Sequence, residues 1–194
     1  RGGSGIQITK KGDLPEASEP LYAPDGRFIY FSARPARYQY NRNVFAGIYQ
    51  VRRYDRVTGQ ATGVTDGYGG SARPELSPDG KTLAFVRRDR LKTVLYLYDL
   101  ERQTERPLWD GLDQDMMENF AWTGSYPGYA FTPDGRSIVI WAKGGLWSVD
   151  RATGQGQWYL DGTHEPLYDF TPLVGSVSGG ADLRLGQPNP AFGA

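Results

Sequence analysis

Arginine and tyrosine alternate in one stretch of the chain, "ARPARYQYNRNVFAG" at 33–47. The stretch contains three arginines and two tyrosines, Arg34, Arg37, Tyr38, Tyr40 and Arg42. A guanidinium group is a planar fork of donors and a tyrosine ring is a rigid amphipathic surface, so this mixture could stack on a planar group or hold a carboxylate. The simpler alternative is a hairpin loop whose tyrosines cover the edge of a sheet.

A second stretch, "WDGLDQDMMENFAW" at 109–122, is rich in carboxylates, namely Asp110, Asp113, Asp115 and Glu118. Oxygen ligands of this kind suit a hard cation such as Ca²⁺. Their spacing does not match an EF-hand loop, however, and one-sided acidic runs are usually solvated. We therefore predict no metal site in the chain and keep these four side chains as the alternative.

Aromatic residues are numerous in the second half of the chain, at Trp122, Tyr126, Tyr129, Trp141 and Trp147. The last three stand in alternating, strand-like runs and are expected in the core between sheets. Trp122 and Tyr126 lie outside those runs and are expected on a contact surface. The predicted surface facing a partner or another domain comprises Arg37, Tyr38, Tyr40, Arg42, Asp113, Trp122 and Tyr126.

No catalytic residue is predicted in this chain. A zinc centre needs several imidazole or thiolate ligands, but the sequence holds one histidine, His164, and no cysteine. A single histidine is more often a surface or packed residue than a ligand. No Gly-x-Ser-x-Gly elbow occurs, and no Gly-x-Gly-x-x-Gly motif joins a strand to a helix. We expect the chain alone to have no enzymatic activity and no cofactor.

The charge balance argues against polyanionic partners. The 194 residues include 22 basic and 22 acidic side chains, so the net charge is zero. No long-range positive field would attract a nucleic acid. No apolar run approaches the roughly 18 residues of a membrane span. We therefore expect neither nucleic-acid binding nor membrane insertion.

A Pro-Asp-Gly turn followed by an alternating apolar run occurs three times. The copies are "APDGRFIYF" at 23–31, "SPDGKTLAF" at 77–85 and "TPDGRSIVI" at 132–140, which begin 54 and 55 residues apart. Proline presets its own φ and glycine accepts a positive φ, so each copy predicts a tight turn between two antiparallel strands.

Each copy belongs to a unit of four strand-like runs. The runs are 19–22, 27–34, 48–55 and 60–67 in the first unit, 73–76, 81–88, 94–100 and 104–111 in the second, and 129–131, 136–143, 145–150 and 155–162 in the third. Four antiparallel strands in a repeat of roughly 40 to 50 residues are typical of a β-propeller blade. The predicted fold is all-β, a partial β-propeller of about three four-stranded blades plus a stray strand of a preceding blade.

These units set the expected boundaries. Residues 1–13 are expected to form the closing strand of a preceding blade and a linker, 14–67 the first blade, 68–113 the second, 114–163 the third, and 164–194 an irregular Gly- and Pro-rich tail or the start of a connection. A ring normally needs four to eight blades. We therefore expect further blades, in the same polypeptide or in another chain, to complete the ring.

Two levels of family resemblance rest on these motifs. "SPDGKTLAF" and "TPDGRSIVI" resemble the PD40 (TolB-type, WD40-like) repeat of bacterial propellers. "LWDGLDQDMMENFAW" followed by "YPGYAFTPDG" resembles the late blades of the propeller that precedes the metal-dependent catalytic domain of large bacterial two-domain amidohydrolases. This second resemblance covers residues 20–153.

The resemblance implies a non-catalytic propeller segment that shapes access to, or scaffolds, a metal-dependent hydrolase domain outside this chain. A divalent metal would then belong to that domain, and the protein would be bacterial and periplasmic or secreted. The alternative is a TolB-like protein-binding propeller module with no associated enzyme. A His-x-His pair further along the reading frame would distinguish the first possibility from the second.

Overall fold

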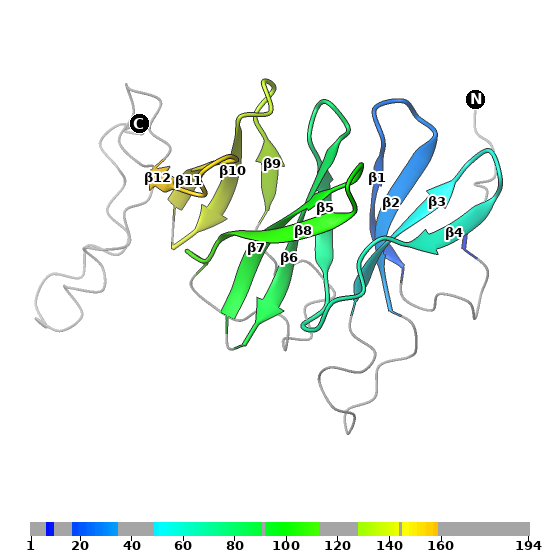
Figure 1. Cartoon of the computed structure of the whole chain (residues 1–194), viewed down its shortest axis with the longest axis horizontal. Helices are drawn as coiled ribbons and strands as arrows, with labels where there is room; N and C mark the ends of the chain where they lie inside the picture. Colours follow the sequence, from blue (N-terminus) through cyan, green and yellow to red (C-terminus); the bar gives the residue numbers. More distant parts are fainter. Residues whose placement is uncertain are drawn as a thin grey trace, which may run out of the picture.

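The computed structural model describes residues 7–9, 17–34, 49–90, 92–112, 128–143 and 145–158. Within these ranges the chain forms twelve β-strands and no helix, and therefore no helix that is long and apolar enough to cross a membrane. The strands group into three separate sheets that follow one another along the chain (Figure 1).

Each sheet contains four consecutive strands in simple antiparallel order. The first sheet comprises β1 (Ser18–Tyr22), β2 (Phe28–Ala33), β3 (Gln50–Asp55) and β4 (Gln60–Gly63). The second comprises β5 (Ala72–Leu76), β6 (Thr82–Asp89), β7 (Lys92–Asp99) and β8 (Thr104–Trp109). The third comprises β9 (Tyr129–Phe131), β10 (Ser137–Ala142), β11 (Gly145–Asp150) and β12 (Gly156–Trp158). This arrangement confirms the predicted all-β class and the four-stranded antiparallel units.

Most predicted strands agree with the observed ones to within two residues at each described end, and two differ more. The fourth strand of the first sheet stops at Gly63. Beyond it, the Val51 backbone N–H donates to the Thr65 side-chain Oγ1 at 2.9 Å and not to a backbone carbonyl of the fourth strand, so the regular strand pairing ends. Of the strand expected within 1–13, only residues 7–9 are described, and residues 8 and 9 form a bend.

The Pro-Asp-Gly turns have the same geometry in all three sheets. Gly26, Gly80 and Gly135 each have φ of +69°, the left-handed conformation expected from the sequence. In the second turn, the Gly80 N–H donates to the Ser77 carbonyl at 2.8 Å and the Lys81 N–H donates to the Asp79 carboxylate at 2.9 Å. These local bonds join each first strand to the second strand of its sheet.

An aspartate closes the third strand of every sheet. The carboxylates of Asp55, Asp99 and Asp150 each accept hydrogen bonds from backbone N–H groups two and three residues further on. Such side-chain-to-backbone bonds stabilise a turn in place of a continued strand. The chain therefore reverses after each aspartate and enters the fourth strand.

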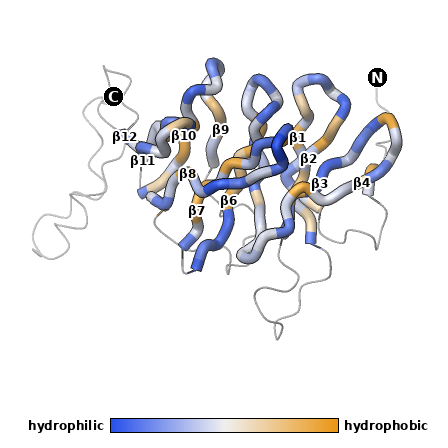
Figure 2. The backbone as a smooth tube through the Cα atoms, viewed as in Figure 1, coloured by the Kyte–Doolittle hydropathy of each residue, from blue (hydrophilic) through white to orange (hydrophobic). Residues whose placement is uncertain are grey.

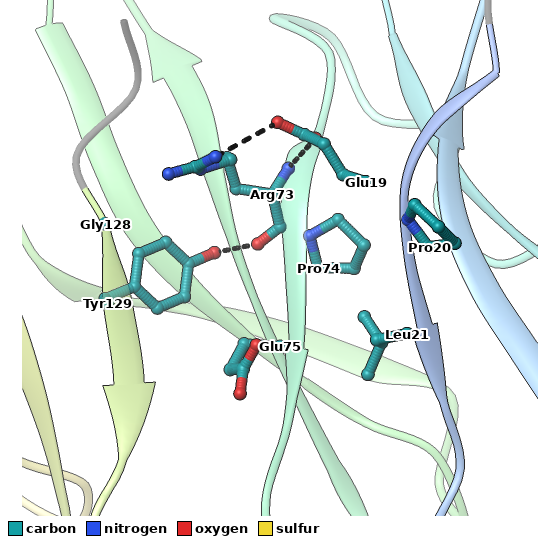
Figure 3. Close-up of a pocket in the computed structure, with 8 residues that line it drawn as sticks. All are labelled: Glu19, Pro20, Leu21, Arg73, Pro74, Glu75, Gly128 and Tyr129. Atoms are coloured by element: carbon teal, nitrogen blue, oxygen red, sulfur yellow. Dashed lines mark hydrogen bonds and ion pairs between the residues drawn. The ribbon is translucent and has the colours of Figure 1, made fainter. Parts of the chain in front are cut away.

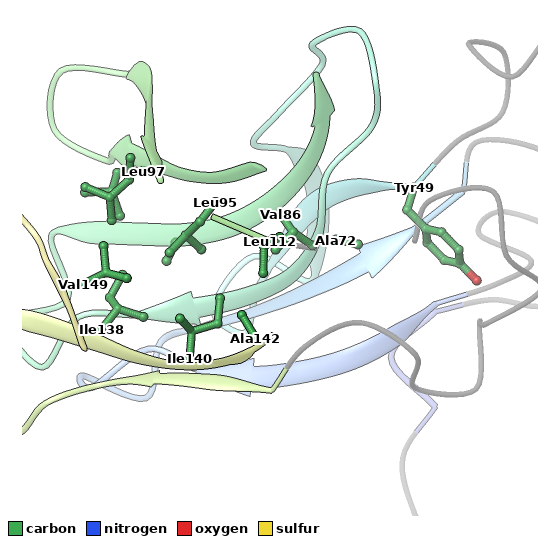
Figure 4. Packing of buried hydrophobic residues seen from close by; sticks show 12 residues of the cluster. Tyr49, Ala72, Val86, Leu95, Leu97, Leu112, Ile138, Ile140, Ala142 and Val149 are labelled. Carbon is green, nitrogen blue, oxygen red and sulfur yellow. The ribbon is translucent and has the colours of Figure 1, made fainter. Parts of the chain in front are cut away.

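Strand alternation gives the second sheet two buried faces. On β6, Leu83 and Phe85 pack toward the first sheet, where Tyr30 and Val51 belong to the same apolar cluster. The residues between them face the other way, and Ala84 and Val86 pack with Ile138 and Ile140 of the third sheet (Figure 4). Figure 2 shows the hydrophobic residues in the strands and the hydrophilic residues in the turns that join β1 to β2, β5 to β6 and β9 to β10.

Candidate functional site

The first strands of the three sheets, β1, β5 and β9, line a common pocket. β5 contacts β1 on one side and β9 on the other, and the cavity between them has a volume of about 270 Å³ (Figure 3). Its lining residues are Glu19, Pro20, Leu21, Arg73, Pro74, Glu75, Gly128 and Tyr129. They lie toward the start of each first strand, away from the Pro-Asp-Gly turns.

The Glu19 carboxylate links the first sheet to the second. Its Oε2 accepts a hydrogen bond from the Ser32 hydroxyl at 2.7 Å and another from the Arg73 backbone N at 2.8 Å. Its Oε1 lies 3.7 Å from the Arg73 guanidinium. One carboxylate thus satisfies a backbone donor and a side chain of the neighbouring strand.

Tyr129 continues this connection to the third sheet. Its hydroxyl donates a hydrogen bond to the Arg73 carbonyl (Figure 3). Burial raises the pKa of the Tyr129 phenol well above its usual value, and the nearby carboxylates of Glu19 and Glu75 act in the same direction. The phenol therefore keeps its proton at neutral pH and remains a hydrogen-bond donor.

The backbone at the pocket is unusual in two sheets. Glu19 and Arg73 occupy equivalent repeat positions and have φ of +56° and +57°, although neither is a glycine. The pairing register shifts at both places, between Ser18 and Leu21 in β1 and between Ala72 and Glu75 in β5. Bulges and left-handed residues of this kind re-aim side chains and are common beside binding sites.

Glu75 is the second carboxylate in the pocket and is half-buried. Burial raises the pKa of its carboxyl, and the positive charge of Arg73 opposes that shift. In the part of the chain that the structure describes, the Glu75 side chain makes neither a hydrogen bond nor an ion pair. Its charge is therefore only partly compensated.

A separate buried arginine has a structural role. Arg87 donates hydrogen bonds to the Gly70 carbonyl at 2.9 Å and the Ser71 hydroxyl at 3.1 Å, and it pairs with Glu105. These bonds tie the connection between the first two sheets to β6 and β8. Each of its three nitrogens makes one of these contacts and the residue is only 5% exposed, so we assign Arg87 a structural role.

Most of the residues predicted to bind a partner or a metal lie outside the described ranges. They are Arg37, Tyr38, Tyr40, Arg42, Asp113, Asp115, Glu118, Trp122 and Tyr126. Asp110 is exposed, and its carboxylate lies 3.6 Å from the Lys92 ammonium. Among the described residues, no group of three or more His, Cys, Asp or Glu side chains is placed to hold a metal ion.

The three aromatic residues predicted to lie in the core differ in how far they are buried. Trp147 and Tyr129 are both partly buried against the apolar cluster, and the Trp147 ring stacks on Trp158 at 4.7 Å, so both predictions are confirmed. The prediction is wrong for Trp141, which is 52% exposed. Trp141 lies on the face of β10 opposite to Ile138 and Ile140, and no described segment covers it.

The sequence motifs did not identify Glu19, Arg73 and Glu75 as candidate site residues. A signal was present, because "EP" at 19–20 and "RP" at 73–74 place a charged residue before proline at equivalent positions of two repeats. Because neighbouring repeats pack side by side, opposite charges at the same position of two successive repeats predict that the two side chains contact each other.

Comparison with known proteins supports the fold. No protein-family model matches the chain. The structure resembles TolB from Acinetobacter baumannii, with a TM-score of 0.53 and 22% identity over 78% of this chain and 33% of that one. It also resembles an acylaminoacyl peptidase from Pyrococcus horikoshii, with a TM-score of 0.53 and 13% identity over 81% of this chain and 26% of that one.

The chain folds as part of a TolB-like β-propeller. Its three sheets are blades, and since β1, β5 and β9 meet between the blades, the pocket lies on their inner strands.

One curated relative extends the comparison to sequence. The chain is 29% identical over 134 residues to the uncharacterized peptidase YuxL of Bacillus subtilis (strain 168). The match covers 66% of this chain and 17% of the relative, so the propeller segment spans about a sixth of that protein's length.

Proposed function

We propose that this chain is the non-catalytic propeller segment of a hydrolase, and that its inner strands line the path to an active site carried elsewhere in the protein. The observation that supports this is the pocket in which Glu19, Arg73 and Tyr129 join three blades around a small cavity. The pocket has charged and hydrogen-bonding groups that can position a substrate, but no activated nucleophile.

The proposed chemistry of the whole protein is hydrolysis of amide bonds. The resemblance of 108–122 and 126–135 to amidohydrolase propellers supports a metal-dependent catalytic domain, with the divalent metal held there. A relative named as a peptidase supports the same bond type through a different class of hydrolase. Amidohydrolases and peptidases both hydrolyse amide bonds, and the dependence of the activity on a metal distinguishes the proposed amidohydrolase from a metal-independent peptidase.

The test uses the complete protein that contains this chain. Its hydrolysis of amide and peptide substrates is measured before and after treatment with a chelator, and again after addition of Zn²⁺ or Mn²⁺. We expect activity to be lost with the chelator and restored by the metal. Activity that resists chelation would favour a peptidase, and a complete protein without hydrolase activity would contradict the proposal.

The isolated chain is expected to hydrolyse neither amides, esters nor peptides, even with added zinc. One histidine and no cysteine cannot supply the usual nitrogen and sulfur ligands. Activity of the purified chain that survives both chelation and the substitution His164→Ala would overturn this expectation.

The second candidate is a TolB-like module that binds proteins and has no enzyme attached. The structural similarity to TolB from two bacteria favours it. It predicts that the reading frame holds further propeller repeats and no catalytic domain. Sequencing the whole reading frame discriminates between the two candidates.

We also propose that further blades, or another chain, cover the third blade. Trp141 and Leu146 form a cross-strand pair on its outer face and are 52% and 49% exposed. The equivalent pair in the second blade, Val86 and Leu95, is fully buried under the third blade. The location outside the cytoplasm stays a prediction, as does the absence of nucleic-acid partners.

A further inference from the structure

The inner-strand pocket has an excess of negative charge. Its lining contains two carboxylates, Glu19 and Glu75, and one guanidinium, Arg73. The Glu19 carboxylate is occupied by three partners, because Ser32 and the Arg73 backbone donate to it and the Arg73 guanidinium lies 3.7 Å away. The uncompensated charge of the pocket therefore resides mainly on Glu75.

The surroundings of Glu75 define which ligand could compensate it. A half-buried carboxylate that lacks a hydrogen-bond partner is unfavourable, and a charged donor relieves that cost. Pro20 and Pro74 have no backbone N–H to offer, and together with Leu21 and the Tyr129 ring they give the cavity apolar walls (Figure 3). An aromatic ring beside a carboxylate suits a cation.

The size of the cavity restricts the ligand further. A volume of about 270 Å³ lies at the small end of ligand pockets and admits a side chain or a chain terminus rather than a large molecule. A compact ammonium group on a short aliphatic stem fits these limits in charge, donors and size.

We propose that this pocket binds the primary ammonium group of a peptide, with the Glu75 carboxylate as its counter-ion. The ammonium belongs either to the N-terminus of the peptide or to a lysine side chain, and both present the same three donors. This inference rests on the proposed function in one respect, namely that a peptide or amide substrate passes along the inner strands.

Binding is tested by calorimetry on the complete protein that contains this chain, with three small probes. The probes are Ala-Ala-Ala amide with a free N-terminus, its N-acetylated form, and Nα-acetyl-lysine amide. We expect at least one of the two amine probes to bind at least ten-fold more tightly than the N-acetylated tripeptide. The tripeptide identifies the N-terminus as the source, and the lysine probe identifies the side chain. If neither amine probe binds more tightly than the N-acetylated tripeptide, the proposal is overturned.

Two variants connect the preference to Glu75. Glu75→Gln should weaken binding of the amine probe at least ten-fold and raise the unfolding temperature slightly at neutral pH, because it removes a partly buried charge. Glu75→Asp keeps the charge and should retain a preference for the amine, which provides the test if the glutamine variant does not fold. Glu101→Gln is the matched control, since Glu101 pairs with Lys81 on the exposed surface and should leave binding unchanged. Undiminished binding by Glu75→Gln would refute the assignment.

This experiment separates the two proposals. Association and product formation are separate readouts, so a protein that prefers the amine probes but has no hydrolase activity would contradict only the proposed function. A protein that hydrolyses amides but binds the acetylated and free peptides equally would contradict only the ammonium site.

Discussion

At the scale of single residues, aspartate has the most regular role in this chain. Asp79 and Asp134 accept the backbone N–H two residues further on in their Pro-Asp-Gly turns, and the aspartates that end the third strands do the same. These bonds are stronger when the carboxylate is ionised than when it is protonated. The pKa of five such carboxyls is lowered. For Asp55, Asp79 and Asp134 the main cause is a side-chain hydrogen bond, from Arg27, Ser77 and Thr132 respectively, and the backbone N–H bonds add to it. For Asp99 and Asp150 the backbone N–H bonds are the main cause.

The fold should lose stability in acid. A carboxyl whose pKa is lower in the folded than in the unfolded state stabilises the fold above the unfolded value of about 3.9, and this contribution is lost as the pH falls through the folded pKa. We expect the free energy of unfolding, measured with urea, to be lower at pH 3 than at pH 7. Glu75 has a raised pKa and acts in the opposite direction, so Glu75→Gln should stabilise the fold at pH 7 but not at pH 3. Equal stability at both pH values would contradict the role of the turn aspartates.

The turn that follows each third strand offers a second test, at the fourth residue beyond the strand end. Gly59 and Gly154 have φ of +72° and +73°, whereas Gln103 holds the equivalent position in the second blade at +56°. A left-handed non-glycine residue costs about 1–2 kcal/mol, and the greater freedom of glycine in the unfolded chain offsets part of that. We expect Gln103→Gly to raise the free energy of unfolding by about 0.5 kcal/mol.

The reciprocal changes serve as controls in the same urea experiment. Gly59→Ala introduces only the left-handed strain, because the nearest atom to its Cβ would be the Tyr54 hydroxyl at 3.8 Å. Gly154→Ala should cost clearly more, since its Cβ would lie 2.2 Å from the Leu108 carbonyl oxygen. An unstable Gln103→Gly variant would show that the glutamine side chain contributes more than its backbone strain costs.

At the scale of elements, the Pro-Asp-Gly turns pack against one another between blades. The Cβ of a residue at position 80 would lie 3.3 Å from Pro24 of the first blade, and one at position 135 would lie 3.5 Å from Pro78 of the second. Arg151 of the third blade adds an ion pair to Asp79 at 3.6 Å. Each turn therefore has a local role within its blade and a packing role against the next.

Substitution of Gly80 by valine should destabilise the protein by about 2 kcal/mol or more. The β-branched side chain would adopt an unfavourable positive φ and would crowd Pro24. Gly63→Val is the matched control, because position 63 lies in β4 and no described residue beyond its chain neighbours comes within 4 Å of its Cβ, and it should change stability by less than about 0.5 kcal/mol. Equal unfolding temperatures for the two variants would contradict the turn assignment.

At the scale of the whole molecule, the third blade presents an apolar outer face. Trp141 and Leu146 are exposed there at the positions where the second blade is fully buried. Large hydrophobic residues that lie exposed beside each other on a protein surface are typical of an interface. The isolated chain has no described segment to cover this face.

We predict that the isolated 194-residue chain associates through the third blade. Size-exclusion chromatography with light scattering should give a mass above 21.6 kDa. The double variant Trp141→Glu with Leu146→Lys should shift the chain toward the monomer, whereas Tyr68→Ser should not, since Tyr68 is exposed in the connection between the first two blades and not on the third. A stable, well-folded monomer of the unaltered chain would refute this prediction.

Local sequence patterns determined the blades. Proline, aspartate and glycine act on the backbone within a few residues of themselves, and alternation of apolar residues assigns the two faces of a strand without reference to the rest of the chain. For this reason the turns at Gly26, Gly80 and Gly135, the four-stranded units and the antiparallel order could all be predicted from the sequence.

Tertiary structure decided which side chains meet. Glu19 and Arg73 are 54 residues apart, and Tyr129 lies 56 residues beyond Arg73, so their contact depends on how the blades pack rather than on any local pattern. The same holds for burial: alternation places Val86 and Trp141 at equivalent positions, yet the first is buried and the second exposed. A strand pattern specifies two faces, but only the neighbouring blade determines whether a face is shielded from water.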